Sequence, residues 1–197
     1  EFLRGHKADL VMADIPFLAF PASRAAGITC LAICNFTWDW VYDHFDRLDP
    51  GWKKAAREIG FFYRQADLAL ELPLGPGLDP TFDRVVNVGL TGRQPRLSRR
   101  EIRFRLGVSE DRRLTLLAFS GLELGAEALS TMSRENPDDL FVFAGPLNLT
   151  GSSFIYADLS GIWYPDLIGA CDLILTKPGY GITADCLAQG STVLYTD

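Results

Sequence analysis

The sequence predicts an α/β fold in which two parallel-sheet units follow one another along the chain. Short apolar runs, each about as long as one strand, alternate with segments of helical period from residue 8 to residue 90. The alternation stops at an arginine-rich stretch and begins again after Gly107. Alternating strands and helices form parallel sheets with right-handed crossovers. We therefore expect two doubly wound units, each shorter than a full domain.

The first unit contains four expected strands and two expected helices. The strands are apolar runs at residues 8–14, 28–34, 67–71 and 85–89. Residues 16–26 have the pattern of a helix that Gly27 closes, and residues 52–66 alternate charged and apolar side chains at helical spacing. Residues 35–39 and 73–80 read as loops, the second because it holds three prolines and two glycines.

An arginine-rich stretch separates the two units. Residues 91–105 contain six arginines, and Pro95 interrupts regular structure there. We expect a first domain at 1–90, a linker at 91–97 and a second domain at 98–197. The simpler interpretation of the arginines is a solvated face, as for most charge runs. The alternative is that one or two of them meet a phosphate.

The second unit repeats the pattern of the first. Its expected strands lie at residues 114–119, 140–144, 172–176 and 192–195. One expected helix begins at Ser98, where Glu101 completes a capping box. Further helices are expected at residues 124–134, 166–170 and 182–189, and a tight turn at residues 177–181 precedes the last of them.

The composition excludes several classes of protein. Of the 197 residues, 48% are hydrophobic and 22% are charged, which is typical of a globular chain. The net charge is −6, and residues 101–197 carry 6 basic against 13 acidic groups, so no nucleic-acid partner is expected. No run of about 18 apolar residues predicts a membrane segment. Both ends of the sequence look cut, which suggests an internal fragment of a longer enzyme.

The cysteines and histidines do not form a metal-binding pattern. The four cysteines include no C-x-x-C pair, and only two histidines accompany them, so no metal site is expected. Cys30 and Cys34 would share one face of a strand and pack as small apolar side chains. Unpaired cysteines and the lack of a secretory signal predict a reducing, cytoplasmic location.

The stretch from Leu173 to Asp185 combines a strand, a glycine turn and a helix. Gly179 and Gly181 allow a tight turn and the close approach of a ligand. Free N–H groups at the start of the following helix favour an anion, and the Thr183 hydroxyl adds a donor. Asp185, one turn further, could accept from a ribose hydroxyl. These features describe a nucleotide diphosphate site, although a structural turn without a ligand has the same local pattern.

These residues resemble a known family. The run from Thr176 to Gly181, followed by Asp185, is similar to the donor-nucleotide signature of the GT-B glycosyltransferases, which include MurG and the UDP-glycosyltransferases. The similarity is greatest to the glycosyltransferase-like domain of arabinokinases and related bacterial proteins. The resemblance implies two Rossmann-like units of the GT-B type, both truncated here. It also implies that Asp185, in place of the more usual glutamate, holds the ribose.

The resemblance extends to other residues of the donor site. Trp163-Tyr164-Pro165-Asp166 is similar to the W-x-P-Q opening of the UDP-glycosyltransferase signature, which implies that Trp163 stacks on a base. Gly121 follows the first strand of the second unit, where such enzymes place a loop beside the diphosphate. The residues implied to bind the donor nucleotide are Gly121, Trp163, Lys177, Gly179, Tyr180, Gly181, Thr183 and Asp185.

In the first unit the resemblance points to two strand ends. Asp14 and the run Asn35-Phe36-Thr37-Trp38-Asp39 match an arabinokinase-type pattern, and open α/β sheets bind ligands at such ends. Asp14 and Asp39 are candidates for the catalytic base. Asn35, Thr37 and Trp38 are candidates for the acceptor side. The alternative is that the aspartates cap helices and that the tryptophan packs.

The resemblance implies transfer of a sugar from a nucleotide diphosphate donor, UDP-linked by analogy, to an acceptor hydroxyl. Backbone N–H groups, the helix dipole and Lys177 would stabilise the leaving diphosphate, with no metal and no cofactor beyond the nucleotide sugar. The expected partners are this nucleotide sugar and a small-molecule or glycan acceptor. Two alternatives stay open on the same fold, a nucleotide-sugar 2-epimerase and a non-catalytic module that senses nucleotide sugars.

Overall fold

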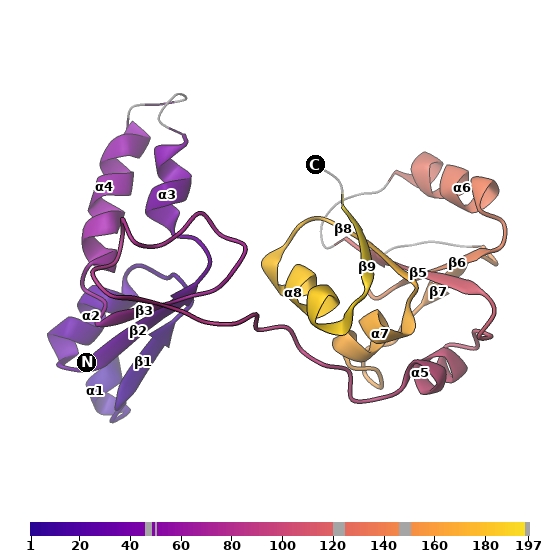
Figure 1. Ribbon diagram of the computed structural model, residues 1–197, viewed down its shortest axis with the longest axis horizontal. Helices are drawn as coiled ribbons and strands as arrows, with labels where there is room; N and C mark the ends of the chain where they lie inside the picture. Colours follow the sequence, from indigo (N-terminus) through magenta and orange to yellow (C-terminus); the bar gives the residue numbers. More distant parts are fainter. Residues whose placement is uncertain (46–48, 50, 120–124, 146–150, 196–197) are drawn as a thin grey trace. The chain divides into compact units, whose positions relative to one another are not determined.

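The computed structural model describes residues 1–45, 49, 51–119, 125–145 and 151–195. The chain separates into two units, Glu1–Leu90 and Thr91–Asp197 (Figure 1). The first unit ends at the residue where the sequence predicts its end. The segment 91–97, predicted as a linker, is instead part of the second unit, because it bonds to two helices of that unit.

The sheet of the first unit has four parallel strands in the order β1-β2-β3-β4. The strands are β1 (Leu10–Ala13), β2 (Thr29–Cys34), β3 (Leu68–Glu71) and β4 (Val85–Asn87). Each lies within a predicted strand and is shorter than it by one to three residues in all. Cys34 aligns with Glu71, so both close their strands at the same edge of the sheet.

The helices of the first unit are α1 (Phe2–Gly5), α2 (Ala19–Ala26), α3 (Trp38–Asp43) and α4 (Gly51–Tyr63). Gly27 ends α2 with φ +74°, as predicted, since a left-handed residue there favours glycine. The prediction of a loop at residues 35–39 is wrong for its last two residues, which are helical. Thr37 is extended and the chain becomes helical at Trp38, with Asp39 in the first turn.

The core of the first unit covers one face of its sheet. Phe20 of α2 and Tyr63 of α4 pack on small side chains of the strands, including Cys30 and Ala32. As predicted, Cys30 and Cys34 are buried on this shared face and are not in disulfides. The opposite face carries apolar side chains that stay largely exposed in the described part of the unit, namely Leu10, Met12 and Val86.

The sheet of the second unit has five parallel strands in the order β7-β6-β5-β8-β9. They are β5 (Arg113–Ala118), β6 (Asp139–Phe143), β7 (Phe154–Tyr156), β8 (Leu173–Thr176) and β9 (Thr192–Tyr195). The sequence did not predict β7, which is three residues long and lies at the edge of the sheet.

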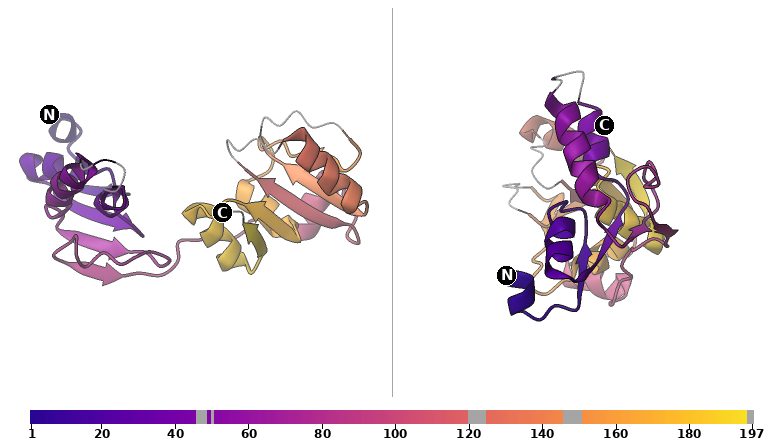
Figure 2. Two further views of the ribbon diagram at one scale, coloured as in Figure 1. Left: turned by 90° about the horizontal axis from the view of Figure 1, so that it is seen from above. Right: turned by 90° about the vertical axis from the view of Figure 1, so that its left-hand side faces the viewer.

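Helices cover both faces of this second sheet, which is therefore doubly wound as predicted. They are α5 (Arg99–Arg105), α6 (Ala126–Glu135), α7 (Tyr164–Ala170) and α8 (Tyr180–Gln189). Helices α5, α7 and α8 share a core with one face of β5 and β8, whereas α6 packs on the opposite face (Figure 2). The Ser98 hydroxyl accepts from the Glu101 N–H (3.2 Å), as the capping box predicts.

Candidate functional site

The turn between β8 and α8 carries the predicted diphosphate site. Helix α8 begins at Tyr180, two residues earlier than predicted, so Gly181 lies in its first turn. Gly179 precedes the helix with an ordinary extended backbone (φ −77°). Among the described residues, a Cβ at Gly181 would meet nothing within 4 Å, and a Cβ at Gly179 would meet only Ile182 Cγ2 at 3.9 Å. Neither backbone strain nor packing within the described chain therefore requires glycine at these two positions.

The same turn leaves hydrogen-bond donors directed away from the helix. No side chain caps α8, because its N-cap residue is a glycine. The first N–H groups of a helix have no partner within it and carry about half a positive charge together. Lys177 is exposed beside the turn, and Thr183 is half-buried in the first turns of α8. The geometry offers an anion both a cation and a helix N-terminus.

The segment 91–97, called the strap below, is fastened along α7 and α8. Gly92 lies directly against α8, where a Cβ would come within 2.1 Å of the Ala184 carbonyl oxygen. The N–H groups of Arg96 and Leu97 both donate to Oδ1 of Asp166, which is a buried residue of α7. The strap is therefore a bonded part of the second unit.

The carboxylate of Asp185, predicted to hold a ribose, accepts hydrogen bonds from Arg93 of this strap. Its side chain is 3% exposed and receives the Arg93 backbone N–H on Oδ1 (2.7 Å). The Arg93 guanidinium donates to both carboxylate oxygens, with Nη2 to Oδ2 at 2.6 Å. These hydrogen bonds raise the pKa of Arg93 above its ordinary value. Both carboxylate oxygens of Asp185 are thus bonded to Arg93 in this structure, and the contact of Asp185 with a ribose stays a prediction.

Trp163, predicted to stack on a base, also meets the strap. The Arg96 guanidinium lies over its ring, 3.9 Å from the centroid, and the Arg93 guanidinium lies 5.8 Å from it. A cation over an indole face is attractive by about 0.5–1 kcal/mol at a partly exposed site. One face of Trp163 is therefore covered by arginine. The sequence suggested a solvated face or a phosphate as the partner of one or two arginines, and it did not identify Asp185 and Trp163 as their partners.

The carboxyl edge of the first sheet gathers three carboxylates around Cys34. Burial raises the pKa of the Cys34 thiol to about 12, and the charges of Asp14, Glu71 and Asp39 contribute further to the rise. Asp14 is exposed just after β1, and Glu71 is the last residue of β3. The two predicted bases thus both act on the Cys34 thiol. Glu71 was missed, although it ends its strand in a carboxylate as the Asp14 run does.

Tyr63 joins the ends of the first two strands. Its hydroxyl donates to the Ile15 carbonyl oxygen (3.0 Å) and accepts from the Trp38 N–H (3.3 Å). Ile15 has φ +58°, a strained conformation for a β-branched residue, which follows Asp14 directly. Burial raises the pKa of Tyr63, so the hydroxyl stays protonated. Tyr63 is therefore a positioning residue for this edge that sequence reasoning did not identify.

The residues predicted for the acceptor side have different surroundings. The Asn35 amide donates to the Leu74 carbonyl oxygen (3.2 Å), and the Asn35 backbone lies so close to Gly75 that no Cβ fits there. Thr37 is buried before α3. Trp38 is 36% exposed and stacks on Tyr42. Of the three, Trp38 presents the largest accessible surface. Gly121 lies outside the described residues.

Two general features of the described residues bear on the chemistry. No three His, Cys, Asp or Glu side chains in this part of the chain are grouped so that they could hold a metal ion. Within the same residues, no helix has the length and apolar character that crossing a membrane requires.

Comparison with solved structures identifies the architecture. The glycosyltransferase of kitacinnamycin matches 99% of this chain with a TM-score of 0.63 and 16% identity. The Streptomyces sp. SF2575 glycosyltransferase SsfS6 matches 99% of it with a TM-score of 0.59 and 16% identity. This chain spans 59% and 52% of those two chains. The two units thus form part of a GT-B glycosyltransferase fold.

Sequence comparison gives a more particular relative. L-arabinokinase of Arabidopsis thaliana is 30% identical over 190 residues. The match covers 95% of this chain but 18% of the plant protein, so the similarity is to a small part of a longer polypeptide. No known protein-family model matches the chain.

The position of Asp185 leads to a prediction about stability. Asp185→Ala is expected to lower the free energy of unfolding of the second unit by about 2 kcal/mol, because the Arg93 N–H loses its buried acceptor. Arg93→Ala should cost less, since half of the Arg93 side chain is exposed and the backbone N–H at position 93 still donates to Asp185. Denaturant unfolding followed by circular dichroism measures both. Asp158→Ala is the control, because that exposed carboxylate bonds only to Ser160 among the described residues. Equal stabilities of Asp185→Ala and wild type would contradict the pairing.

Proposed function

We propose that this chain is the part of a metal-independent glycosyltransferase that binds a nucleotide diphosphate sugar, UDP-linked by analogy, and transfers the sugar to an acceptor hydroxyl. The GT-B architecture supports this activity, since the similar solved structures are glycosyltransferases. The first unit would supply the acceptor side and the second unit the donor side. Fold alone does not define a reaction, so the residues of the β8–α8 turn carry the argument.

The observation that carries the proposal is that neither packing among the described residues nor backbone strain requires glycine at positions 179 and 181. Glycine costs about 0.5–1 kcal/mol in a helix relative to alanine, so Gly181 is unfavourable for α8 itself. A Cβ there would point into open space among the described residues. A backbone free of side chains at a helix N-terminus allows a diphosphate to approach the N–H groups. Close approach of a ligand accounts for both glycines.

The leaving diphosphate would be stabilised by groups that the fold already orients. The N–H groups of the first turn of α8 would donate to phosphate oxygens as negative charge develops, and Lys177 would add a positive charge. Such preoriented donors need no reorganisation at the moment of transfer. Asp14 or Asp39 would accept the proton of the acceptor hydroxyl. The diphosphate site does not require Asp185, whose carboxylate Arg93 occupies.

Gly181→Ala tests this proposal with two effects of opposite sign. The variant should be as stable as the wild type or more stable by about 0.5 kcal/mol, because alanine favours the helix. Its affinity for UDP should fall by roughly tenfold or more, because the Cβ occupies the space of the diphosphate. Isothermal titration calorimetry with UDP and thermal unfolding of the same samples measure the two quantities.

Gly161→Ala is the matched control, since a Cβ at that exposed loop position also meets nothing within 4 Å among the described residues. It should leave the affinity for UDP unchanged. A panel of UDP, GDP, dTDP and ADP selects the base through the rise in unfolding temperature that binding produces. If Gly181→Ala binds every nucleotide as the wild type does, the site assignment is wrong. Binding without release of free diphosphate in the presence of acceptors would instead favour a sensing module.

A further inference from the structure

Helices α3 and α4 of the first unit enclose a groove with unusual chemistry. The cavity has a volume of about 480 Å³ and is lined by side chains of both helices and by Thr81. Its polar groups include two carboxylates of α3, Asp39 and Asp43. They also include the guanidinium groups of Arg57 in α4 and of Arg64, which directly follows α4. In the described part of the chain, no ion pair joins any of these four side chains to another.

Asp39 leaves one carboxylate oxygen without a donor. Its Oδ2 accepts from the Thr81 hydroxyl (3.0 Å). Its Oδ1 is buried and has no hydrogen-bond partner among the described residues. Buried polar atoms in native proteins nearly always have a partner, and an unpaired one costs about 1–3 kcal/mol. The Oδ1 atom therefore lacks a donor that the described residues could supply, and a hydroxyl of a ligand in the groove would provide one.

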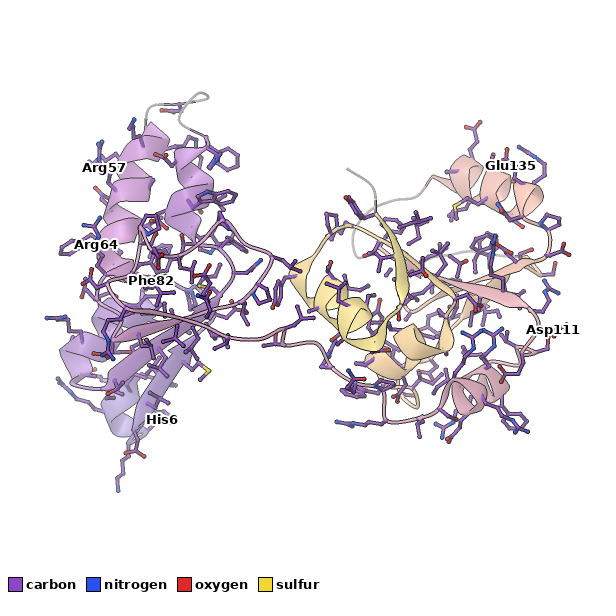
Figure 3. The ribbon with its side chains drawn as sticks, viewed as in Figure 1. His6, Arg57, Arg64, Phe82, Asp111 and Glu135 are labelled. Carbon is purple, nitrogen blue, oxygen red and sulfur yellow. The ribbon has the colours of Figure 1, made fainter. Side chains whose placement is uncertain are left out.

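Helix α4 is shaped to receive this carboxylate. Gly60 stands opposite Asp39, and a Cβ there would lie 3.1 Å from Asp39 Oδ2. Arg57 precedes Gly60 by three residues and Arg64 follows it by four, so the two arginines lie about one turn to either side on the same face. Figure 3 shows both arginines on the same side of α4. The Asp39 carboxylate thus lies between two exposed guanidinium groups.

Two aromatic rings complete the groove. Trp40 is 44% exposed and Phe61 is 64% exposed, and both line the cavity. An exposed aromatic ring offers an apolar face on which the C–H face of a sugar can pack. Guanidinium groups bind phosphate and carboxylate in a bidentate manner, and carboxylates accept from hydroxyls. The combined set matches a ligand that has hydroxyl groups, a C–H face and one anionic group.

We propose that this groove binds the acceptor and that the acceptor is an anionic sugar, one that carries a phosphate or a carboxylate. Arg57 and Arg64 hold the anionic group, and Asp39 Oδ1 accepts from a sugar hydroxyl. Asp43, one turn along α3, provides a second acceptor for hydroxyls. That the bound sugar is the acceptor rests on the proposed transferase activity. The binding of an anionic sugar by the first unit does not depend on that activity.

Calorimetry on the full chain tests the proposal with four probes: glucose 1-phosphate, glucuronate, inorganic phosphate and glucose. At least one of the two anionic sugars should bind more tightly than glucose and than phosphate by roughly tenfold, because each lacks one half of the recognition. Tighter binding of glucose 1-phosphate would identify the anionic group as a phosphate, and tighter binding of glucuronate would identify it as a carboxylate. The double variant Arg57→Gln, Arg64→Gln should weaken that probe by about tenfold or more. Lys53→Gln, which removes a charge of α4 outside the groove, is the control and should change nothing.

Asp39→Asn separates the hydroxyl contact from the anion contact. It should weaken the anionic sugar and leave the affinity for inorganic phosphate unchanged, and circular dichroism verifies that it folds. Binding of glucose as tight as that of the anionic sugars, no binding of any probe, or an unaffected double variant would overturn the inference. UDP binding by the second unit is measured on the same samples. If UDP does not bind but the anionic sugar does, the donor assignment fails while the groove stands.

Discussion

Replacing Arg103 by alanine is expected to lower the free energy of unfolding of the second unit by about 3–5 kcal/mol. The side chain is fully buried and belongs to α5. Its Nη1 donates to the Ala170 carbonyl oxygen (3.0 Å), and its Nη2 donates to the carbonyl oxygens of Ser109 (2.9 Å) and Arg112. One guanidinium therefore joins the end of α7 to the loop before β5, and alanine removes the donor from all three carbonyls, of which the Ala170 bond is fully buried.

The charge of Arg103 has a partner as well. Asp172, just before β8, lies 3.4 Å from its Nη1 and also accepts the Leu114 N–H (2.8 Å). Burial alone would raise the pKa of Asp172, but the bonds from Leu114 and Arg99 hold it below its ordinary value. Because the folded-state pKa is lowered, this contribution to stability is present above the unfolded pKa and is lost as the pH falls through the folded one.

Thermal unfolding measures the effect, since a loss of 1 kcal/mol shifts the midpoint by about 4–8 °C in a domain of this size. Arg103→Lys should be nearly as damaging as alanine, because one ammonium does not reach three carbonyls in the geometry of a planar fork. Arg105→Ala is the control on the same helix. That arginine is partly exposed and pairs with Glu101 across one turn, so its loss should cost less than about 1 kcal/mol. Similar midpoints for Arg103→Ala and Arg105→Ala would refute the assigned role.

Most strands and helices could be predicted because their signals are local. The run 192–195 predicts β9 to the residue, since four apolar or β-branched residues follow a glycine that ends the preceding helix. The same local reasoning missed α3, whose aromatic side chains have no clear apolar face, and β7, which has three residues. Short elements depend on contacts with neighbours far along the chain, and a local pattern does not contain those contacts.

The candidate site was predictable at its glycine turn and not at its charged groups. Gly179 and Gly181 stand out in the sequence because two glycines recur at a strand–helix junction, although a structural turn has the same pattern. By contrast, the partner of Asp185 is Arg93, which lies 92 residues earlier. The local pattern of a run of arginines predicts a solvated linker. The buried carboxylates that bind it lie far along the chain and meet it only in the folded structure. The pairing of the strap with α7 and α8 is thus a tertiary property.

Gly92→Ala is expected to detach the strap from α8. The added Cβ would lie 2.1 Å from the Ala184 carbonyl oxygen and 2.5 Å from Ala188 Cβ, distances that no real side chain adopts. Helix α8 is packed on the core and cannot yield, so the strap has to move. Its displacement would separate Arg93 from Asp185 and the N–H groups of Arg96 and Leu97 from Asp166. Two buried carboxylates would lose their donors, for a loss of about 3–5 kcal/mol at most.

Amide hydrogen exchange locates this effect along the chain. The N–H groups of Arg93, Arg96 and Leu97 all donate to carboxylates in the wild type and should be protected. In Gly92→Ala their exchange should accelerate more than that of β5 and β8, because the strap opens without unfolding the sheet. Gly89→Ala, three residues earlier, is the control, since a Cβ there meets nothing within 4 Å among the described residues. If both variants keep wild-type protection at these amides, then glycine at position 92 is not what lets the strap lie on α8.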